Sequence, residues 1–193
     1  MKIGRLVLRA AVGGFFFGHG MQKLLGWFGG PGLDATAQGF HQIGMRPGRR
    51  NAIAAGVSEA AGGTAIVLGF ATPLAASTLI ATMLTAIHRV HLKNGPWNTT
   101  GGYEYNVVLI AALLTLVEVG PGEPSLDHAL GLEWSRSDWA ALSLLLGAAG
   151  AAGAHLLASL EPADEPGQAA PSQDGSAGSG EDATQPRAET SAP

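Results

Sequence analysis

The feature that most constrains this chain is a series of long apolar segments separated by short breaker sequences. Of the 193 residues, 46 % are hydrophobic and only 13 % are charged. A soluble globular domain carries about 25 % charged residues. The sequence therefore predicts an all-α membrane protein rather than a water-soluble domain.

The first four apolar segments predict a four-helix transmembrane bundle, because about 20 residues at ~1.5 Å each cross a hydrocarbon core of ~30 Å. These segments cover residues 6–27, 51–70, 73–92 and 103–119. In the first segment, Gly14 and Gly18 form a small-xxx-small pair, which predicts the close approach of a neighbouring helix. Between the first two segments, residues 34–45 predict a short interfacial helix with Phe40 and Ile43 on its apolar side.

The C-terminal part of the chain differs in composition from the core that we assign to residues 1–120. An acidic connector with Pro and Gly occupies residues 121–137, and residues 138–160 form a fifth apolar segment that is long enough to span a membrane. Residues 161–193 consist mainly of Pro, Ala, Gly, Ser and acids. Such a segment buries too little apolar surface to offset its chain entropy, so we expect a disordered tail.

Charge and cysteine content exclude several classes of function. The chain has no Cys, which removes disulfides, Cys-ligated zinc, iron–sulfur clusters and c-type haem attachment. The net charge of −4 comes from acids in the C-terminal part, and the nearly neutral remainder argues against a nucleic-acid partner. Basic residues are more frequent near the loops after the first and third segments, which favours a cytoplasmic position for both loops.

Those two loops lie on the same side of an up-and-down bundle, and most embedded ionisable groups lie near them. Ionisable groups inside a membrane are costly and usually line a site or pair with one another. Glu59 is either protonated or paired, and Lys23, Arg89 or a His are the candidate partners. A purely structural ion pair remains the alternative to a functional one.

The candidate site lies at this end of the bundle. We expect Glu59, His19 and Glu104 to take the catalytic, proton-handling roles, and the glycines on both sides of His19 leave room for a ligand. His88 and His91 are three residues apart and would share a helical face, but the pair alone is a weak metal signal, and we assign no metal. The remaining candidates are ligand-binding: Gln22, Lys23, His91, Trp97, Asn98, Tyr103 and Asn106.

Three strings in the sequence resemble the DoxX family of small bacterial membrane proteins. They are L-V-L-R-A-A-V-G-G-F-F-F-G-H-G-M-Q-K-L-L-G-W-F-G-G-P-G, S-E-A-A-G-G and N-G-P-W-N-T-T-G-G-Y-E-Y-N, within residues 5–121. The resemblance implies a multi-pass protein of the bacterial plasma (inner) membrane. Members are similar to DoxD-type subunits of an archaeal thiosulfate:quinone oxidoreductase. In mycobacteria a DoxX protein is associated with superoxide dismutase and a sulfurtransferase, which implies soluble oxidoreductases as partners.

We therefore expect a redox-associated membrane subunit of an oxidoreductase or oxidative-stress complex, which binds a quinone or a reactive small molecule. His19 and Gln22 would donate hydrogen bonds to a carbonyl, and Glu59 or Glu104 would handle the proton. A non-catalytic scaffold that recruits soluble redox enzymes is the alternative. A small transporter is a third hypothesis, although the sequence shows no inverted repeat.

Overall fold

A computed structural model describes residues 3–132 and 134–161, and this part of the chain is helical without a strand. Its longer helices are α1 (Ile3–Leu25), α2 (Gly32–Gln42), α3 (Gly48–Leu68), α4 (Thr72–Ala86), α5 (Glu104–Val119) and α7 (Ser137–Ser159). Its short helical segments are η1 (Trp27–Gly29), η2 (Ile87–His91), η3 (Leu92–Asn94), η4 (Asn98–Thr100) and α6 (Leu126–Ala129). The all-α prediction is confirmed. The expected disordered tail lies, apart from Glu161, outside the described residues.

Each predicted apolar segment overlaps a long helix, and residues 34–45 overlap α2, which begins two residues earlier. The third segment differs from the expected single α-helix. The α-helical part ends at Ala86, and residues 87–91 form η2, a π-helical turn that continues directly from α4. Turns of this kind are rare and frequently mark functional sites.

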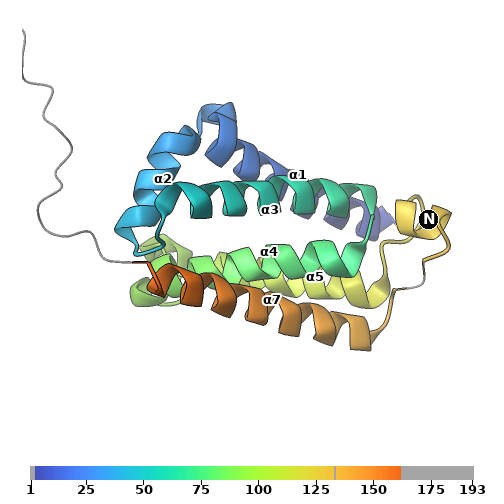
Figure 1. Cartoon of the computed structure of the whole chain (residues 1–193). Coiled ribbons are helices and arrows are strands. Elements are labelled where there is room, and N and C mark those ends of the chain that lie inside the picture. The colour runs from blue at the N-terminus through green and yellow to red at the C-terminus, as the bar shows by residue number, and fades with distance from the viewer. Residues whose placement is uncertain (1–2, 133, 162–193) are drawn as a thin grey trace, which may run out of the picture. The chain divides into compact units, whose positions relative to one another are not determined.

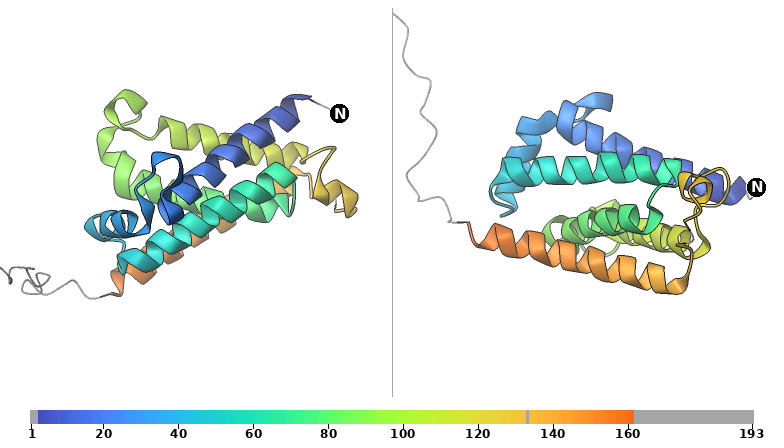
Figure 2. Two further views of the ribbon diagram at one scale, coloured as in Figure 1. Left: turned by 90° about the horizontal axis from the view of Figure 1, so that it is seen from above. Right: turned by 45° about the vertical axis from the view of Figure 1, so that its right-hand side comes forward.

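α3, α4 and α7 run side by side, with α4 between the other two (Figure 1). α1 packs mainly on α3, and α5 packs on α4 and α7 (Figure 2). α2 lies across the end of the bundle at which α1 ends and α3 begins. The shared hydrophobic core includes Phe16, Ile66, Leu79, Leu113 and Leu116.

The contact between α1 and α3 depends on glycine, but not on the predicted pair. A Cβ atom on Gly13 would lie 2.6 Å from the carbonyl oxygen of Gly63, so the two backbones are in direct contact. Gly14 and Gly18 have no such neighbour within 4 Å, and the prediction that they form the helix contact is wrong. The spacing of small residues does not reveal which face of α1 is buried. That face is a stripe with helical period: Arg9, Val12, Gly13, Phe16 and Gly20.

The other end of the bundle, which we call the Asp127 end, holds buried charges that were not expected there. The Asp127 carboxylate accepts hydrogen bonds from the backbone N–H of Ala71 (2.7 Å) and Thr72 (3.0 Å) and from the Thr72 hydroxyl (2.7 Å). It thereby satisfies free N–H groups at the start of α4. Arg9 is also buried, and it donates to the carbonyls of Ile66, Val67, Pro121 and Pro124. The expectation that embedded charges gather at one end is thus only half right.

α7 packs closely on α4 along its length. The Ser143 hydroxyl donates to the carbonyl of Pro73 at 3.0 Å, and a Cβ atom on Gly147 would lie 2.5 Å from Cγ2 of Ile80. The contact partners rise in residue number together on α4 and α7, from 73 and 143 to 80 and 147, so the two helices run parallel. α7 therefore ends at the same end of the bundle as α1 and α4.

By length and composition, two of the described helices could cross a membrane, namely α3 and α7. α4 and α5 have only 15 and 16 residues, and α1 carries Arg5, Arg9 and Lys23. The helical bundle is confirmed, whereas the four transmembrane crossings of its first part remain a prediction.

Candidate functional site

A cavity of about 730 Å³ lies among α1, α2, α3, α4, α5 and α7. Its inner wall is largely apolar and includes Phe16, Phe40, Ile43, Met45, Met83 and Leu109. The polar side chains that reach it include His19, Lys23, Glu59, His91, Tyr105 and Asn106. Large apolar cavities with a few converging polar groups are the usual form of small-molecule sites.

Lys23 and Glu59 form an ion pair on the cavity wall. Lys23 Nζ lies 2.5 Å from Glu59 Oε2, and the exposed fractions of the two side chains are 24 % and 4 %. Glu59 is buried because it belongs to the stripe of α3 that faces α1, together with Gly56 and Gly63. Among the three predicted partners of Glu59 the structure selects Lys23, and the pairing offsets the cost of removing the carboxylate from solvent.

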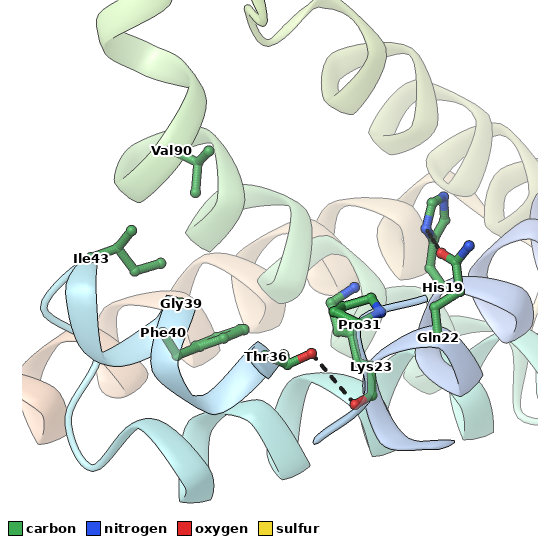
Figure 3. A pocket seen from close by; sticks show the side chains of 9 residues that line it. All are labelled: His19, Gln22, Lys23, Pro31, Thr36, Gly39, Phe40, Ile43 and Val90. Carbon is green, nitrogen blue, oxygen red and sulfur yellow. Dashed lines mark hydrogen bonds between the residues drawn. The ribbon is translucent and has the colours of Figure 1, made fainter. Parts of the chain in front are cut away.

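His19 and Gln22 lie at the mouth of the site (Figure 3). A smaller pocket of about 370 Å³ adjoins the cavity there. The two polar side chains lie on one side of it, and Phe40 of α2 and Ile43, which directly follows α2, lie on the other (Figure 3). His19 Nδ1 lies 3.1 Å from Gln22 Oε1, and the His19 side chain is exposed. His19 lines both the pocket and the cavity, whereas Gln22 lines only the smaller pocket.

Asn106 is a buried amide whose hydrogen-bonding capacity is largely unused. It is 7 % exposed and lines the cavity from the first turns of α5. Within the described residues, its side chain makes one hydrogen bond, from Nδ2 to the Met83 sulfur at 3.4 Å. A thioether is a weak acceptor. Buried amides normally find strong partners, so this one is available to a ligand.

Four of the predicted site residues line neither the cavity nor the smaller pocket: Trp97, Asn98, Tyr103 and Glu104. The Glu104 carboxylate accepts a hydrogen bond from the backbone N–H of Asn98 at 2.8 Å, so it holds the loop before α5 in shape. His91 Nδ1 lies 2.7 Å from the carbonyl oxygen of Gly101 in the same loop, and His91 also reaches the cavity. Of the last three residues of the motif at residues 94–106, which open α5, Tyr105 and Asn106 line the cavity and Glu104 does not.

A cluster at the end of α4 was missed by the sequence analysis. Arg89 Nε donates to His155 Nδ1 at 2.8 Å, and the rings of His88 and His155 meet edge to face with centroids 4.6 Å apart. His88 thus contacts α7 while His91 contacts the loop, and the expected shared face of these two histidines is wrong because η2 is not α-helical. The described residues contain no group of three side chains of the types His, Cys, Asp and Glu placed to hold a metal ion. Arg89 and His155 are 66 residues apart in the sequence, so no local sequence pattern could predict their contact.

Comparison with known proteins identifies one matching protein family and one similar curated protein. The DoxX family model matches residues 4–92, which hold α1 to η2. The chain is 32 % identical over 115 residues to “Putative oxidoreductase CatD” of Bacillus subtilis (strain 168), and the match covers 60 % of this chain and 79 % of that protein. No solved structure matches the chain. The chain belongs to the DoxX family, as its motifs predicted, and DoxX is a family of membrane proteins.

Proposed function

We propose that this chain is a multi-pass subunit of the bacterial plasma membrane that binds a quinone in the 730 Å³ cavity and serves an oxidoreductase complex. The observation that carries the proposal is a buried ion pair, Lys23–Glu59, on the wall of an apolar cavity that also presents the Asn106 amide. The printed name of the Bacillus subtilis relative, which calls that protein an oxidoreductase, supports the redox part.

The outer faces of the bundle support a membrane position. Large apolar side chains are exposed on several helices, among them Val57 of α3, Val108 of α5 and Leu145 of α7. α4 and η2 together give 20 residues of continuous helix, which is ~30 Å and enough for one crossing. α5 is shorter at ~24 Å, so its ends would lie at the membrane interfaces.

The cavity fits a quinone by shape and by chemistry. A quinone head is a flat apolar ring with two carbonyl acceptors, and aromatic and aliphatic side chains such as Phe16, Phe40 and Leu109 suit the ring. The Lys23 ammonium and the Asn106 amide are donors for the carbonyls. A bound quinone would supply the capacity to take up two electrons and two protons.

The residues of this chain would bind the ligand and hold a proton beside it. Asn106 would orient one carbonyl through its free amide hydrogen. The Lys23–Glu59 pair holds a proton between Nζ and Oε2 within reach of the cavity, where a general acid or base has to be. His19 and Gln22 at the exposed mouth would link this pair to solvent protons.

Quinone content of the purified protein tests the proposal. The full chain is purified in mild detergent, extracted with organic solvent and assayed for quinone, with an absorption spectrum and a metal assay alongside. We expect about one equivalent in the wild type and a loss of about tenfold in affinity for a short-chain quinone in Asn106→Leu, which corresponds to about 1.4 kcal/mol. The control is Asp34→Asn, which changes an exposed ion pair with Arg49, because neither residue lines the cavity.

Two results would overturn the proposal. One is a wild-type protein that neither contains quinone nor binds added quinone, which would favour the scaffold alternative. The other is unchanged binding in both Asn106→Leu and Glu59→Gln.

A further inference from the structure

We infer that the hydrocarbon chain of the ligand lies in a groove between α3 and α7, and that the ligand enters the cavity through this groove from the side, out of the bilayer. The inference rests on the proposed quinone function and extends it from the head group to the whole molecule. It means that the natural ligand has a long alkyl or isoprenoid chain.

The groove is the outer part of the 730 Å³ cavity. Its floor is a face of α4 that runs from Thr85 to Leu74, which is ~16 Å along the helix axis. Its two walls come from α3 and α7, and their residues recur with helical spacing: Ala54, Ala55 and Ser58 on α3, and Leu146, Gly150 and Ala154 on α7.

Small side chains keep this groove open. α3 and α7 each pack on α4 but not extensively on each other. The width of the groove between them therefore depends on the size of the side chains that α3 and α7 place there. On the α7 side, a Cβ atom on Gly150 would lie 3.2 Å from the Cβ of Ala81, which shows that α7 is already close to α4. On the α3 side, Ala54 and Ala55 leave the remaining width free.

The groove opens toward the hydrocarbon region. Ala54, Leu74 and Leu146 are exposed, and the two helices that flank the groove, α3 and α7, are the two whose length and composition suit a membrane crossing. A side opening between two such helices faces lipid chains rather than water. A hydrocarbon chain is therefore the occupant that this opening fits.

Charge at the inner end distinguishes a quinone from a phospholipid. The Lys23 ammonium is already neutralised by the Glu59 carboxylate, so no net positive charge is left on this pair for a phosphate. The other buried polar side chains that line the cavity, Ser77 and Asn106, are neutral. The cavity thus offers a neutral polar site joined to an apolar groove, which matches a neutral head with a long chain.

Photolabelling of the full chain in liposomes tests this placement. The probe is a benzoquinone that carries a diazirine at the far end of a decyl chain. After irradiation, we expect label on residues 54–58 and 146–154 and its loss in the presence of excess unlabelled decyl analogue. Label that falls instead on the outward side chains Val107 and Val108 of α5, or that the competitor does not displace, would overturn the inference.

A matched pair of variants separates this inference from the proposed function. Ala54→Phe fills the groove, and Ala111→Phe makes the same change at another exposed helical alanine, on α5 and outside the cavity. For Ala54→Phe we expect about tenfold weaker binding of the decyl analogue, or about 1.4 kcal/mol, and unchanged binding of 2,3-dimethoxy-5-methyl-1,4-benzoquinone, which has no long chain. Ala111→Phe should change neither.

The outcomes distinguish the two hypotheses. If the wild type binds neither quinone, the proposed function fails and this inference fails with it. If the wild type binds both quinones and Ala54→Phe weakens neither, the quinone site stands and the groove inference is overturned.

Discussion

At the scale of single residues, the Lys23–Glu59 pair gives the sharpest prediction. Glu59 is 3 % exposed, so Lys23→Met would leave a buried carboxylate without a partner. We expect this variant to lower the free energy of unfolding by about 3 kcal/mol. The double variant Lys23→Met/Glu59→Gln removes both charges and should recover most of that loss.

Thermal unfolding in detergent measures this double-mutant cycle. Single and double variants are compared with the wild type at one pH and one detergent concentration. Costs that simply add would show that the two side chains are not coupled.

Asp127 supports a second prediction at this scale. Asp127→Ala removes the acceptor of three hydrogen bonds to Ala71 and Thr72 and leaves two backbone N–H groups at the start of α4 without a partner. We expect the free energy of unfolding to fall by about 2 kcal/mol. Asp34→Ala, at an exposed ion pair, is the control and should cost less than about 1 kcal/mol. Thermal unfolding measures both losses. A similar loss in the two variants would contradict the capping role of Asp127.

Residue roles were predictable where the chemistry is local in sequence and were missed where it is not. An acid inside an apolar segment pointed to Glu59 directly, and its pairing with Lys23 was among the alternatives. Asp127 lies in a polar connector, where an acid normally contacts water, and nothing local shows that it folds back on α4. Glu104 was expected at the site, but it lines neither the cavity nor the smaller pocket, because its carboxylate accepts a hydrogen bond from its own loop.

At the scale of helices, the α1–α3 contact predicts opposite effects for two glycines. A Cβ atom on Gly63 would lie 2.5 Å from both the Gly13 carbonyl oxygen and the Phe17 backbone nitrogen, and backbone atoms cannot move aside cheaply. We expect Gly63→Ala to destabilise the protein by about 2 kcal/mol. Gly14→Ala places a methyl group in open space and should stabilise the helix by roughly 0.5–1 kcal/mol.

Thermal unfolding of the two alanine variants checks this pair of effects. The comparison is well matched because both changes add one methyl group within a helix. A shift of both midpoints in the same direction would show that the α1–α3 interface is not where the structure places it.

Helix positions were predictable from apolar runs and breakers, since those patterns act within one helix. The buried face of each helix was not, because it depends on partners elsewhere in the chain. Gly14 and Gly18 match the expected spacing, but neither would place a Cβ atom within 4 Å of another helix, whereas Gly13, directly before Gly14, contacts α3. The π-helical turn at residues 87–91 likewise has no local sequence signal.

At the scale of the whole molecule, a multi-pass arrangement predicts where the loops lie. If α1, α3, α4 with η2, α5 and α7 each cross the membrane, residues 99 and 135 are on opposite sides. The chain has no Cys, so Thr99→Cys and Ser135→Cys each introduce a single thiol at an exposed position. We expect a membrane-impermeant thiol reagent to label Ser135→Cys in intact cells and Thr99→Cys only after permeabilisation.

The pattern of labelling separates two errors. Reversed labelling would mean that the orientation is wrong while the crossings are right. Labelling of both positions in intact cells would contradict the multi-pass arrangement.

Arg9 sets a constraint on the order in which the protein assembles. Its guanidinium binds carbonyls at the end of α3 and others as far away as Pro124, 115 residues later in the chain. At about 5–20 residues per second, ribosomes need on the order of 10 s to make that stretch. During this interval the first helix carries a charge whose full set of partners does not yet exist, because the carbonyls of Pro121 and Pro124 are made last. The nascent chain must therefore shelter Arg9, in water or against the insertion machinery, until its C-terminal half arrives.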